Sequence, residues 1–331
     1  MQPRDLLDRP LRTVRISVTD RCNFRCRYCM PREAPQAFSD RGALLTFEEM
    51  AAIVRALARR GVANVRLTGG EPLLRRGLED LVAAVRAVPG IADVAMTTNG
   101  SLLGERAEAL AASGLDRVTV SLDALDEDLF RQITDGATQL RRVLEAIDVA
   151  AEAGLTPVKV NTVVRRGRNE GQIELIAGHF RGTGVVPRFI EYMDVGTSNG
   201  WQRSDVVEAT EIVERISARW PLEHVPRGPG VVAERWQYAD GAGEVGIIAS
   251  VTRPFCGDCT RVRLTADGKL FLCLFGRDGV DLRSVLRSGA SPSDLGDIVA
   301  GAWQRRDDRY SESRDAMTVP WPRMEMNYVG G

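Results

Sequence analysis

The stretch Cys22-Asn23-Phe24-Arg25-Cys26-Arg27-Tyr28-Cys29 places three cysteines close together near the start of the chain. Three thiolates can hold three corners of a cubane iron–sulfur cluster, which leaves the fourth iron free to bind a small molecule. A structural zinc site normally closes with four ligands, and the two histidines, His179 and His224, lie far from this run. The spacing therefore favours a 4Fe-4S cluster with one open iron over a zinc site.

A second set of three cysteines, Cys256, Cys259 and Cys273, lies near the other end of the chain. By itself this set is compatible with a zinc ribbon that lacks its fourth ligand or with a second open cubane, and we favour the cubane. Disulfide frameworks belong mainly to small secreted proteins, so six cysteines in 331 residues fit one poorly. We therefore expect two separate metal centres.

The composition excludes several classes of protein. A chain of 331 residues with 44% hydrophobic residues can bury one large domain and a smaller one. No apolar run approaches the ~20 residues that a membrane helix needs, and the start has no signal-peptide core. A net charge of -1 gives no general attraction to nucleic acid or to a membrane surface. We expect a cytoplasmic protein without a nucleic-acid or membrane partner.

From about residue 11 to residue 193, short strand patterns alternate with amphipathic helix patterns, which is typical of a parallel β/α array. The expected strands are 13–18, 62–68, 93–98, 117–122, 158–164 and 188–193. The expected helices are 47–60, 75–88, 103–113, 138–153 and 170–181. Thr46 and Glu49 form a predicted capping box before the first helix. Six units are too few for the usual eight-fold barrel, so we predict an α/β fold with an incomplete (β/α)6 TIM-type barrel.

Alternation along the strands predicts a polar interior, because side chains two residues apart share a face. Lys159 falls on the same face as Asn161, and Arg15 falls opposite Val14 and Ile16. Helices cover the outside of such a barrel, so the aliphatic faces should point outward and the polar faces inward. Closed barrels pack apolar side chains inside. A polar interior therefore indicates a binding cavity.

Beyond about residue 194 the regular alternation ends. One helix is expected near 206–219 and another near 293–306. Asp240-Gly241 and Asp267-Gly268 are favoured two-residue hairpin turns. The charged tail from about residue 307 should be mobile until it docks.

These patterns divide the chain into a barrel, residues 1–225, and a smaller C-terminal α+β module, residues 226–331. The second cysteine set lies in the module, which ends at Gly330-Gly331.

The residues around the first cysteines resemble the signature of radical S-adenosylmethionine enzymes, in which an aromatic residue such as Tyr28 precedes the last cysteine. The longer stretch Arg15–Pro31 is similar to the GTP 3',8-cyclase (molybdenum cofactor biosynthesis protein A) family within that superfamily. Similar segments continue almost to the end of the chain: Gly69-Gly70-Glu71-Pro72, Thr97-Thr98-Asn99-Gly100, Ser121-Leu122-Asp123, Phe255–Thr265, Cys273 and Gly330-Gly331.

The resemblance implies a partial barrel and a lyase reaction that starts molybdenum cofactor biosynthesis. GTP would be converted to (8S)-3',8-cyclo-7,8-dihydroguanosine 5'-triphosphate. Cleavage of S-adenosylmethionine at the first 4Fe-4S cluster would give a 5'-deoxyadenosyl radical, which would abstract hydrogen from ribose C3' before that carbon attacks guanine C8. The product would be handed to the enzyme that forms cyclic pyranopterin. The chain would act as a monomer or a homodimer, and the sequence does not indicate its electron donor.

The resemblance also implies roles for individual residues, with no catalytic side chain beyond the clusters and the cofactor. Contacts with S-adenosylmethionine are expected from Tyr28, Gly70, Ser121 and Met193. Contacts with GTP are expected from Arg15, Arg66, Thr97, Lys159, Arg261, Val262 and Arg263. The metal ligands would be Cys22, Cys26, Cys29, Cys256, Cys259 and Cys273. The second 4Fe-4S cluster would touch the guanine, and the two terminal glycines would reach into the active site. Strand alternation places Arg188 opposite Met193, so Arg188 is left out.

Two other functions compete with this interpretation. A radical enzyme that modifies peptides would explain a second cluster, but such maturases usually carry a longer cysteine-rich extension. The closely spaced Arg261 and Arg263 also favour a phosphorylated substrate. A non-enzymatic iron or redox sensor would need a basic DNA-reading element, and the sequence contains none.

Overall fold

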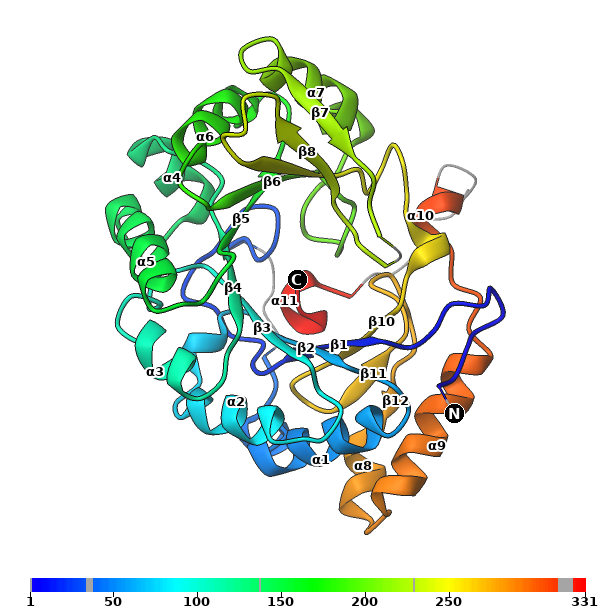
Figure 1. Cartoon of the computed structure of the whole chain (residues 1–331). Helices are drawn as coiled ribbons and strands as arrows, with labels where there is room; N and C mark the ends of the chain where they lie inside the picture. Colours follow the sequence, from blue (N-terminus) through cyan, green and yellow to red (C-terminus); the bar gives the residue numbers. More distant parts are fainter. Residues whose placement is uncertain (1, 34–37, 137, 229, 315–323) are drawn as a thin grey trace.

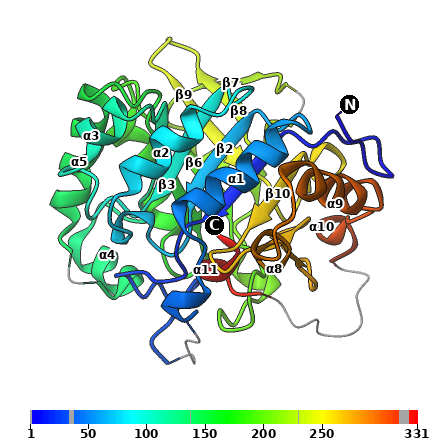
Figure 2. The ribbon, with the colours of Figure 1, turned by 90° about the horizontal axis from the view of Figure 1, so that it is seen from below.

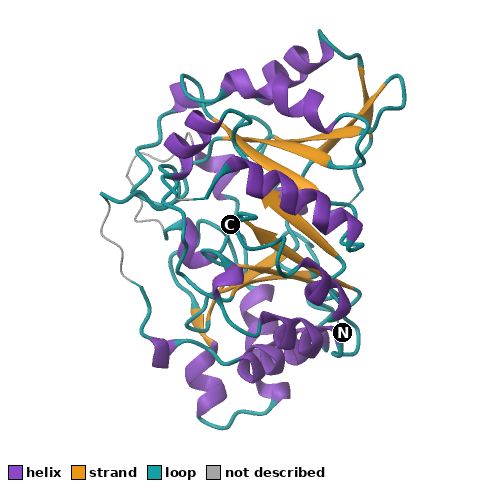
Figure 3. Ribbon diagram, turned by 90° about the vertical axis from the view of Figure 1, so that its left-hand side faces the viewer, coloured by secondary structure: helices purple, strands orange, loops and turns teal. Residues whose placement is uncertain are grey.

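The computed structural model describes residues 2–33, 38–136, 138–228, 230–314 and 324–331. One curved, twelve-stranded sheet surrounds a central hollow, and helices cover much of its outer side (Figure 1). The strand order is β12-β11-β10-β1-β2-β3-β4-β5-β6-β9-β8-β7. The two edge strands, β12 and β7, do not pair with each other in this order, so the barrel is incomplete, as predicted. Figure 3 shows the strands in orange inside a layer of purple helices.

The six predicted strands form the parallel part of the sheet, and their bounds differ from the predictions by at most two residues. They are β1 (Thr13–Ser17), β2 (Asn64–Thr68), β3 (Asp93–Thr98), β4 (Arg117–Ser121), β5 (Lys159–Val164) and β6 (Val186–Glu191). Pairing is parallel throughout, with Arg15 of β1 in register with Arg66 of β2. This register places the two arginines side by side on the inner face of the sheet.

The helices between these strands pack on the outer face. They are α1 (Phe47–Ala58), α2 (Leu78–Arg86), α3 (Ala107–Ala112), α4 (Glu127–Thr134), α5 (Leu140–Glu152) and α6 (Ile173–Phe180). The capping box before α1 is confirmed: the Glu49 amide donates to Thr46 Oγ1 over 3.2 Å, and the Thr46 amide donates to Glu49 Oε2 over 2.8 Å. Helix α4 was not predicted, because it is only eight residues long, is mostly polar and buries only Phe130 and Thr134.

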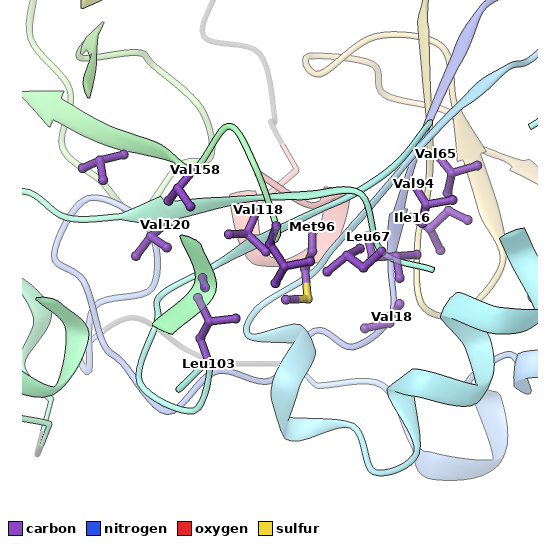
Figure 4. Close-up of a cluster of buried hydrophobic side chains, with 14 of the residues drawn as sticks. Ile16, Val18, Val65, Leu67, Val94, Met96, Leu103, Val118, Val120 and Val158 are labelled. Carbon is purple, nitrogen blue, oxygen red and sulfur yellow. The ribbon is translucent and has the colours of Figure 1, made fainter. Parts of the chain in front are cut away.

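The hydrophobic core lies between the sheet and these helices, not inside the barrel. Figure 4 shows outward-facing strand residues such as Ile16, Leu67, Met96 and Val120, each fully buried. The predicted alternation is therefore confirmed. Burying an aliphatic side chain of this size contributes about 1.5–3 kcal/mol. The outer layer thus stabilises the fold and leaves the inner face free for polar residues.

The C-terminal part of the chain extends the same sheet at both ends. Strand β9 (Glu244–Ile248) pairs in parallel with β6, and β10 (Arg261–Leu264) pairs in parallel with β1. The remaining strands add antiparallel hairpins outside these two: β7 (Leu222–Val225), β8 (Glu234–Tyr238), β11 (Lys269–Phe271) and β12 (Val280–Asp281). Hairpins form at both predicted positions, but their connections, residues 239–243 and 265–268, are longer than the two-residue turns that were predicted. Residues on the two sides of the expected 225/226 boundary therefore share one sheet.

In the described part of the chain, five helices follow the barrel: α7 (Ala209–Ser217), α8 (Leu282–Arg287), α9 (Pro292–Gln304), α10 (Tyr310–Ser313) and α11 (Met326–Val329). Helix α9 packs on α1 and on α8, and α8 packs on β11 (Figure 2). Helix α11, at the C-terminus, lies within the hollow of the sheet (Figure 1). The described part of the tail is thus docked, and residues 315–323 lie outside the described residues.

None of the helices in the described ranges has the length and apolar character that crossing a membrane requires.

A buried carboxylate ties the barrel to its C-terminal extension. Glu191, at the end of β6, accepts hydrogen bonds from the amides of Ala209 over 2.8 Å, Val251 over 2.7 Å and Thr252 over 2.8 Å. Its side chain is fully buried. One buried side chain thereby fixes the start of α7 and the loop after β9 against β6.

Replacing Glu191 with Ala should lower the free energy of unfolding by about 3 kcal/mol or more, because hydrogen bonds to a charged group contribute about 1.5–3 kcal/mol each. Denaturant unfolding measures this change. Glu223→Ala, on the exposed side of β7, is the matched control and should have little effect. Equal effects of the two substitutions would contradict the role of Glu191 as an anchor.

Candidate active site

A cavity of about 820 Å³ occupies the hollow of the sheet. Its wall combines the inner face of the parallel strands, the loop after β1 and parts of β9 and β10. Both cysteine sets line it. The volume lies within the range of about 300–1,000 Å³ that is usual for small-molecule sites.

The first cysteine set lies on the loop that follows β1, where the chain turns over the end of β2. The Phe24 amide donates to Cys22 Sγ over 3.3 Å, and the Cys29 amide donates to the Cys26 carbonyl over 2.9 Å. Gly70, after β2, allows this close approach, because a Cβ there would lie 2.2 Å from the Arg21 carbonyl oxygen. The glycine is therefore required by the path of the cysteine loop.

The three thiols of this loop are half-buried, free and close enough to affect one another. Burial raises the pKa of Cys22 to about 11 and that of Cys29 to about 12. The pKa of Cys26 is also raised, first by burial and then by Cys29. Metal ligation deprotonates thiols outright. Such thiols need a positive group in the cavity to become thiolates, as iron would provide.

No three described Cys, His, Asp or Glu residues converge on one point that could hold a single metal ion. A cubane does not require convergence, because each thiolate binds a different iron. The arrangement of Cys22, Cys26 and Cys29 around one edge of the cavity therefore fits an iron–sulfur cluster with one open corner.

The second cysteine set also faces the cavity. Cys256 and Cys259 flank a short turn before β10, and Cys273 follows β11. Burial raises the pKa of Cys273 to about 11. Burial acts on Cys259 in the same direction, but Arg261 and Arg306 outweigh it and hold the pKa of that thiol at about 6. The second set thus contains a thiol that is ionised at neutral pH.

Ten cationic side chains line the cavity, and six of them are at least half-buried and make no ion pair in the described ranges: Arg15, Arg66, Lys159, Arg188, Arg261 and Arg263. Within the described ranges, none of these six has a carboxylate within salt-bridge distance. Arg117, on β4 nearby, differs because its guanidinium pairs with Asp93 over 2.6 Å. The inner face therefore carries a concentration of positive charge that the protein does not neutralise.

The pKa values show that burial and neighbouring cations disfavour the charged forms of these side chains. Burial, followed by repulsion from Arg263 and Arg261, lowers the pKa of Arg15 well below its ordinary value. Burial lowers the pKa of Arg66 to about 10 and, helped by neighbouring arginines, that of Arg188 to about 9 and that of Lys159 to about 8. Two buried polar atoms of this face, Asn161 Oδ1 and Arg188 Nε, have no hydrogen-bond partner among the described residues. A multiply charged anion would stabilise the charged forms of these cations and could accept a hydrogen bond from Arg188 Nε.

Comparisons with known proteins agree with this geometry. Residues 16–179 match the family description "Radical SAM superfamily", and residues 186–312 match "Molybdenum Cofactor Synthesis C". The chain is 50% identical to GTP 3',8-cyclase of Acidothermus cellulolyticus, over 99% of both chains. It is 44% identical to GTP 3',8-cyclase of Staphylococcus aureus, over 100% of this chain and 99% of the other. The chain belongs to the GTP 3',8-cyclase family.

A solved structure also resembles the fold. Streptococcus suis SuiB bound to S-adenosylmethionine aligns with a TM-score of 0.65 and 15% identity, over 92% of this chain and 68% of that one. At this identity the likeness concerns the fold alone. Membership of the radical S-adenosylmethionine superfamily implies a 4Fe-4S cluster and S-adenosylmethionine, and the first cysteine set fits that cluster.

Most of the residues that the family resemblance singles out lie around the cavity. Those expected at the cofactor, Tyr28, Gly70, Ser121 and Met193, line it together. Tyr28 is fixed by donating its hydroxyl proton to Asp123 Oδ2 over 2.6 Å. The residues expected at the nucleotide also line the cavity, with one exception: Arg15, Arg66, Thr97, Lys159, Arg261 and Arg263.

The exception is Val262. Its side chain is fully buried in the hydrophobic core, on the opposite face of β10 from its two arginine neighbours. The Val262 side chain therefore does not line the cavity, and only its main chain could contact a ligand there. The contact of Val262 with the nucleotide stays a prediction.

Arg188 was missed. It lies on the inner face, lines the cavity and donates to Thr119 Oγ1 over 3.4 Å. Counting alternate residues from Arg188 to Met193 places the two on opposite faces, but β6 ends at Glu191, and the alternation does not continue into the loop. Alternation within β6 alone would have placed Arg188 on the inner face.

The two C-terminal glycines of this family member reach the same cavity. Arg263 donates to the Gly330 carbonyl, and Thr68 Oγ1 donates to the Gly331 carbonyl over 3.0 Å. Gly330 has a φ of 75°, and a Cβ there would lie 2.6 Å from Thr68 Cγ2. A side chain would therefore be excluded at this position, which explains why a glycine ends the path into the cavity.

Affinity for inorganic tripolyphosphate should fall as the pH rises above about 8, because Lys159 then loses the charge that attracts the anion. One linked proton limits the fall to about tenfold per pH unit. Titration calorimetry between pH 6.5 and 9.5 measures it. Lys159→Arg, which stays charged over this range, should remove that component and also correct for titration of the ligand. An equal pH dependence of the affinity in the parent and in Lys159→Arg would contradict the assignment of this titration to Lys159.

Proposed function

We propose that this protein converts GTP to (8S)-3',8-cyclo-7,8-dihydroguanosine 5'-triphosphate, the first step of molybdenum cofactor biosynthesis. The observation that carries this proposal is the composition of one cavity wall. Two cysteine sets and six cations without carboxylate partners surround a space of small-molecule size. Membership of the GTP 3',8-cyclase family supports the same reaction.

The first cysteine set would hold a 4Fe-4S cluster with S-adenosylmethionine at its open iron. When bound and reduced, this pair would supply a 5'-deoxyadenosyl radical able to take a hydrogen atom from ribose C3' of GTP. The C3' radical would add to guanine C8, and one further electron from the reductant and one proton would give the 7,8-dihydro product. The chain's own residues orient the cofactor. Tyr28 is held by Asp123, Gly70 allows close approach of the backbone, and Ser121 and Met193 complete the surrounding wall.

The cations would bind the triphosphate. Arg15 lies in register with Arg66 on one side and with Arg263 on the other, so three guanidinium groups belong to neighbouring strands. Lys159 and Arg188 extend this charge across the barrel, because their strands β5 and β6 are also neighbours. Fork-shaped guanidinium groups suit phosphate oxygens, and binding would offset the repulsion that now lowers their pKa values.

The second cysteine set, Cys256, Cys259 and Cys273, would hold a second 4Fe-4S cluster that contacts the guanine. Its position in the cavity wall, next to Arg261, supports this role. The low pKa of Cys259 also favours thiolate ligation. The three ligands again leave one iron open, which is what direct contact with a substrate atom requires.

Enclosure of the site would protect the radical. The inner faces of the strands and Gly331 line the cavity, and bound substrate and cofactor would complete its closure. Exclusion of water prevents side reactions of reactive intermediates. The 1–225 barrel and the 226–331 module would thus act together, each supplying one metal centre to one enclosed site.

The protein would work in the cytoplasm, where thiols stay reduced, and would pass its product to the enzyme that forms cyclic pyranopterin.

Anaerobically reconstituted protein should convert GTP when S-adenosylmethionine and a strong reductant are present. We expect 5'-deoxyadenosine and a cyclised nucleotide in equal amounts, measured by chromatography with mass spectrometry. GTP carrying deuterium at C3' should transfer that deuterium to 5'-deoxyadenosine. Cleavage of S-adenosylmethionine that does not depend on GTP, or transfer from another carbon, would contradict the proposal.

Replacing Cys273 with Ala should remove only the second cluster. Iron content should fall from about eight to about four atoms per chain, since each cubane holds four. Arg261→Ala is a useful companion, because it should weaken GTP binding while leaving the iron content unchanged. Loss of all iron in the Cys273 variant would show that the two centres are not independent.

A further inference from the structure

Three charged residues form a buried network behind the second cysteine set. Asp5 and Arg9 come from the segment before β1, and Arg306 follows the end of α9. Their exposed fractions are 7%, 2% and 3%. The N-terminal segment runs beside α9 (Figure 1), where the Leu6 amide donates to the Arg306 carbonyl over 3.1 Å.

One carboxylate bridges the two guanidinium groups. Asp5 Oδ2 accepts from Arg9 Nε over 2.6 Å and from Arg306 Nη1 over 3.2 Å. Each arginine also reaches one cysteine of the turn before β10. Arg9 Nη1 donates to the Cys256 carbonyl over 2.7 Å, and Arg306 Nη1 donates to the Cys259 carbonyl over 3.0 Å.

The arginines are held firmly in place. The Arg306 guanidinium lies 4.5 Å from the centre of the Trp303 ring, and the Trp303 indole donates to the Arg9 carbonyl over 2.9 Å. Arg306 lines the cavity as well. Asp308, which is half-buried, lies 3.4 Å from Arg306 Nε and neutralises part of the charge.

Burying three ionised side chains is costly, and apolar residues of the same size would often serve stability as well or better. In addition, Arg9 Nη2 has no hydrogen-bond partner among the described residues. The same segment contains an ordinary surface pair, Arg4 with Asp8, whose side chains are 54% and 81% exposed. The contrast indicates that the buried network serves the cysteine turn and not only the attachment of the N-terminal segment.

We propose that Asp5, Arg9 and Arg306 are positioning residues for the second metal centre. They fix the carbonyls of Cys256 and Cys259, and the guanidinium groups place positive charge behind the thiolates. This inference rests on the proposed second cluster. Outer-shell partners orient metal ligands, and nearby charge and hydrogen bonds set cluster potentials. Positive charge favours the more negative, reduced cluster, so the arginines raise its reduction potential.

The test uses the full-length chain with Cys22, Cys26 and Cys29 all changed to Ala, so that only the second centre can bind iron. The parent should contain about four irons per chain. Zinc or no metal in this parent would refute the second cluster itself, and with it this inference. With iron present, the variants below test the network separately from the proposed reaction.

Arg306→Gln is compared with Arg305→Gln, because Arg305 is the exposed neighbour. Chelator-driven iron release should be at least about ten times faster in Arg306→Gln, the usual scale for outer-shell partners. Its midpoint potential, from a redox titration followed by electron paramagnetic resonance, should fall. Arg305→Gln should match the parent in both measurements. Arg306→Lys keeps the charge, so its potential should stay near that of the parent while iron release remains faster.

Asp5→Asn, with the exposed Asp8→Asn as its control, is the decisive variant, because its midpoint potential should shift in the direction opposite to that of Arg306→Gln. Loss of the bridging carboxylate should also speed iron release, but it removes negative charge and should therefore raise the midpoint potential. A merely structural role would not shift the potentials of Arg306→Gln and Asp5→Asn in opposite directions. Shifts of the same sign, or iron release equal to that of the two controls, would overturn the proposal. If Arg306→Gln does not fold, Arg306→Lys and Asp5→Asn decide the question by the same criteria.

Discussion

Uncompensated positive charge inside the sheet is the constraint on which the rest of the structure depends. Six cations share one cavity without a carboxylate partner in the described chain, and burial together with their mutual repulsion lowers the pKa of Arg15 and Lys159. A closed barrel with an apolar interior could not hold them. The open, curved sheet with its hydrophobic core on the outer face provides both the space and the rigidity that such a site needs.

The pairing of strands from opposite ends of the chain brings the chemistry together. Strand β10 pairs in parallel with β1, so Arg261 and Arg263 lie on the same face of the sheet as Arg15. Strand β9 joins β6 at the other side, and Glu191 secures that junction. The N-terminal segment and the end of α9 then meet behind the second cysteine set through Asp5. Two cysteine sets far apart in sequence thus face one cavity.

The sequence predicts what depends on local pattern. Strand β3 has the predicted bounds, and the Thr46 capping box forms as expected, because alternation and capping are properties of a few neighbouring residues. The pairing of β9 and β10 with opposite edges of the sheet was not predicted, since it depends on contacts between distant segments. Arg188 was missed because strand alternation was carried beyond the end of β6. The Asp5 network was missed because charged residues in such patterns usually lie in solvent, and only the three-dimensional arrangement shows that Asp5, Arg9 and Arg306 are buried.

The central claim is that two open iron centres and a cationic wall enclose one nucleotide. Anomalous diffraction at the iron and zinc absorption edges, from crystals grown without oxygen in the presence of GTP, tests it most directly. The account predicts two iron peaks, one beside Cys22, Cys26 and Cys29 and one beside Cys256, Cys259 and Cys273, with the triphosphate between Arg15, Arg66 and Lys159. A zinc peak at the second cysteine set, or a nucleotide bound outside the cavity, would contradict the account.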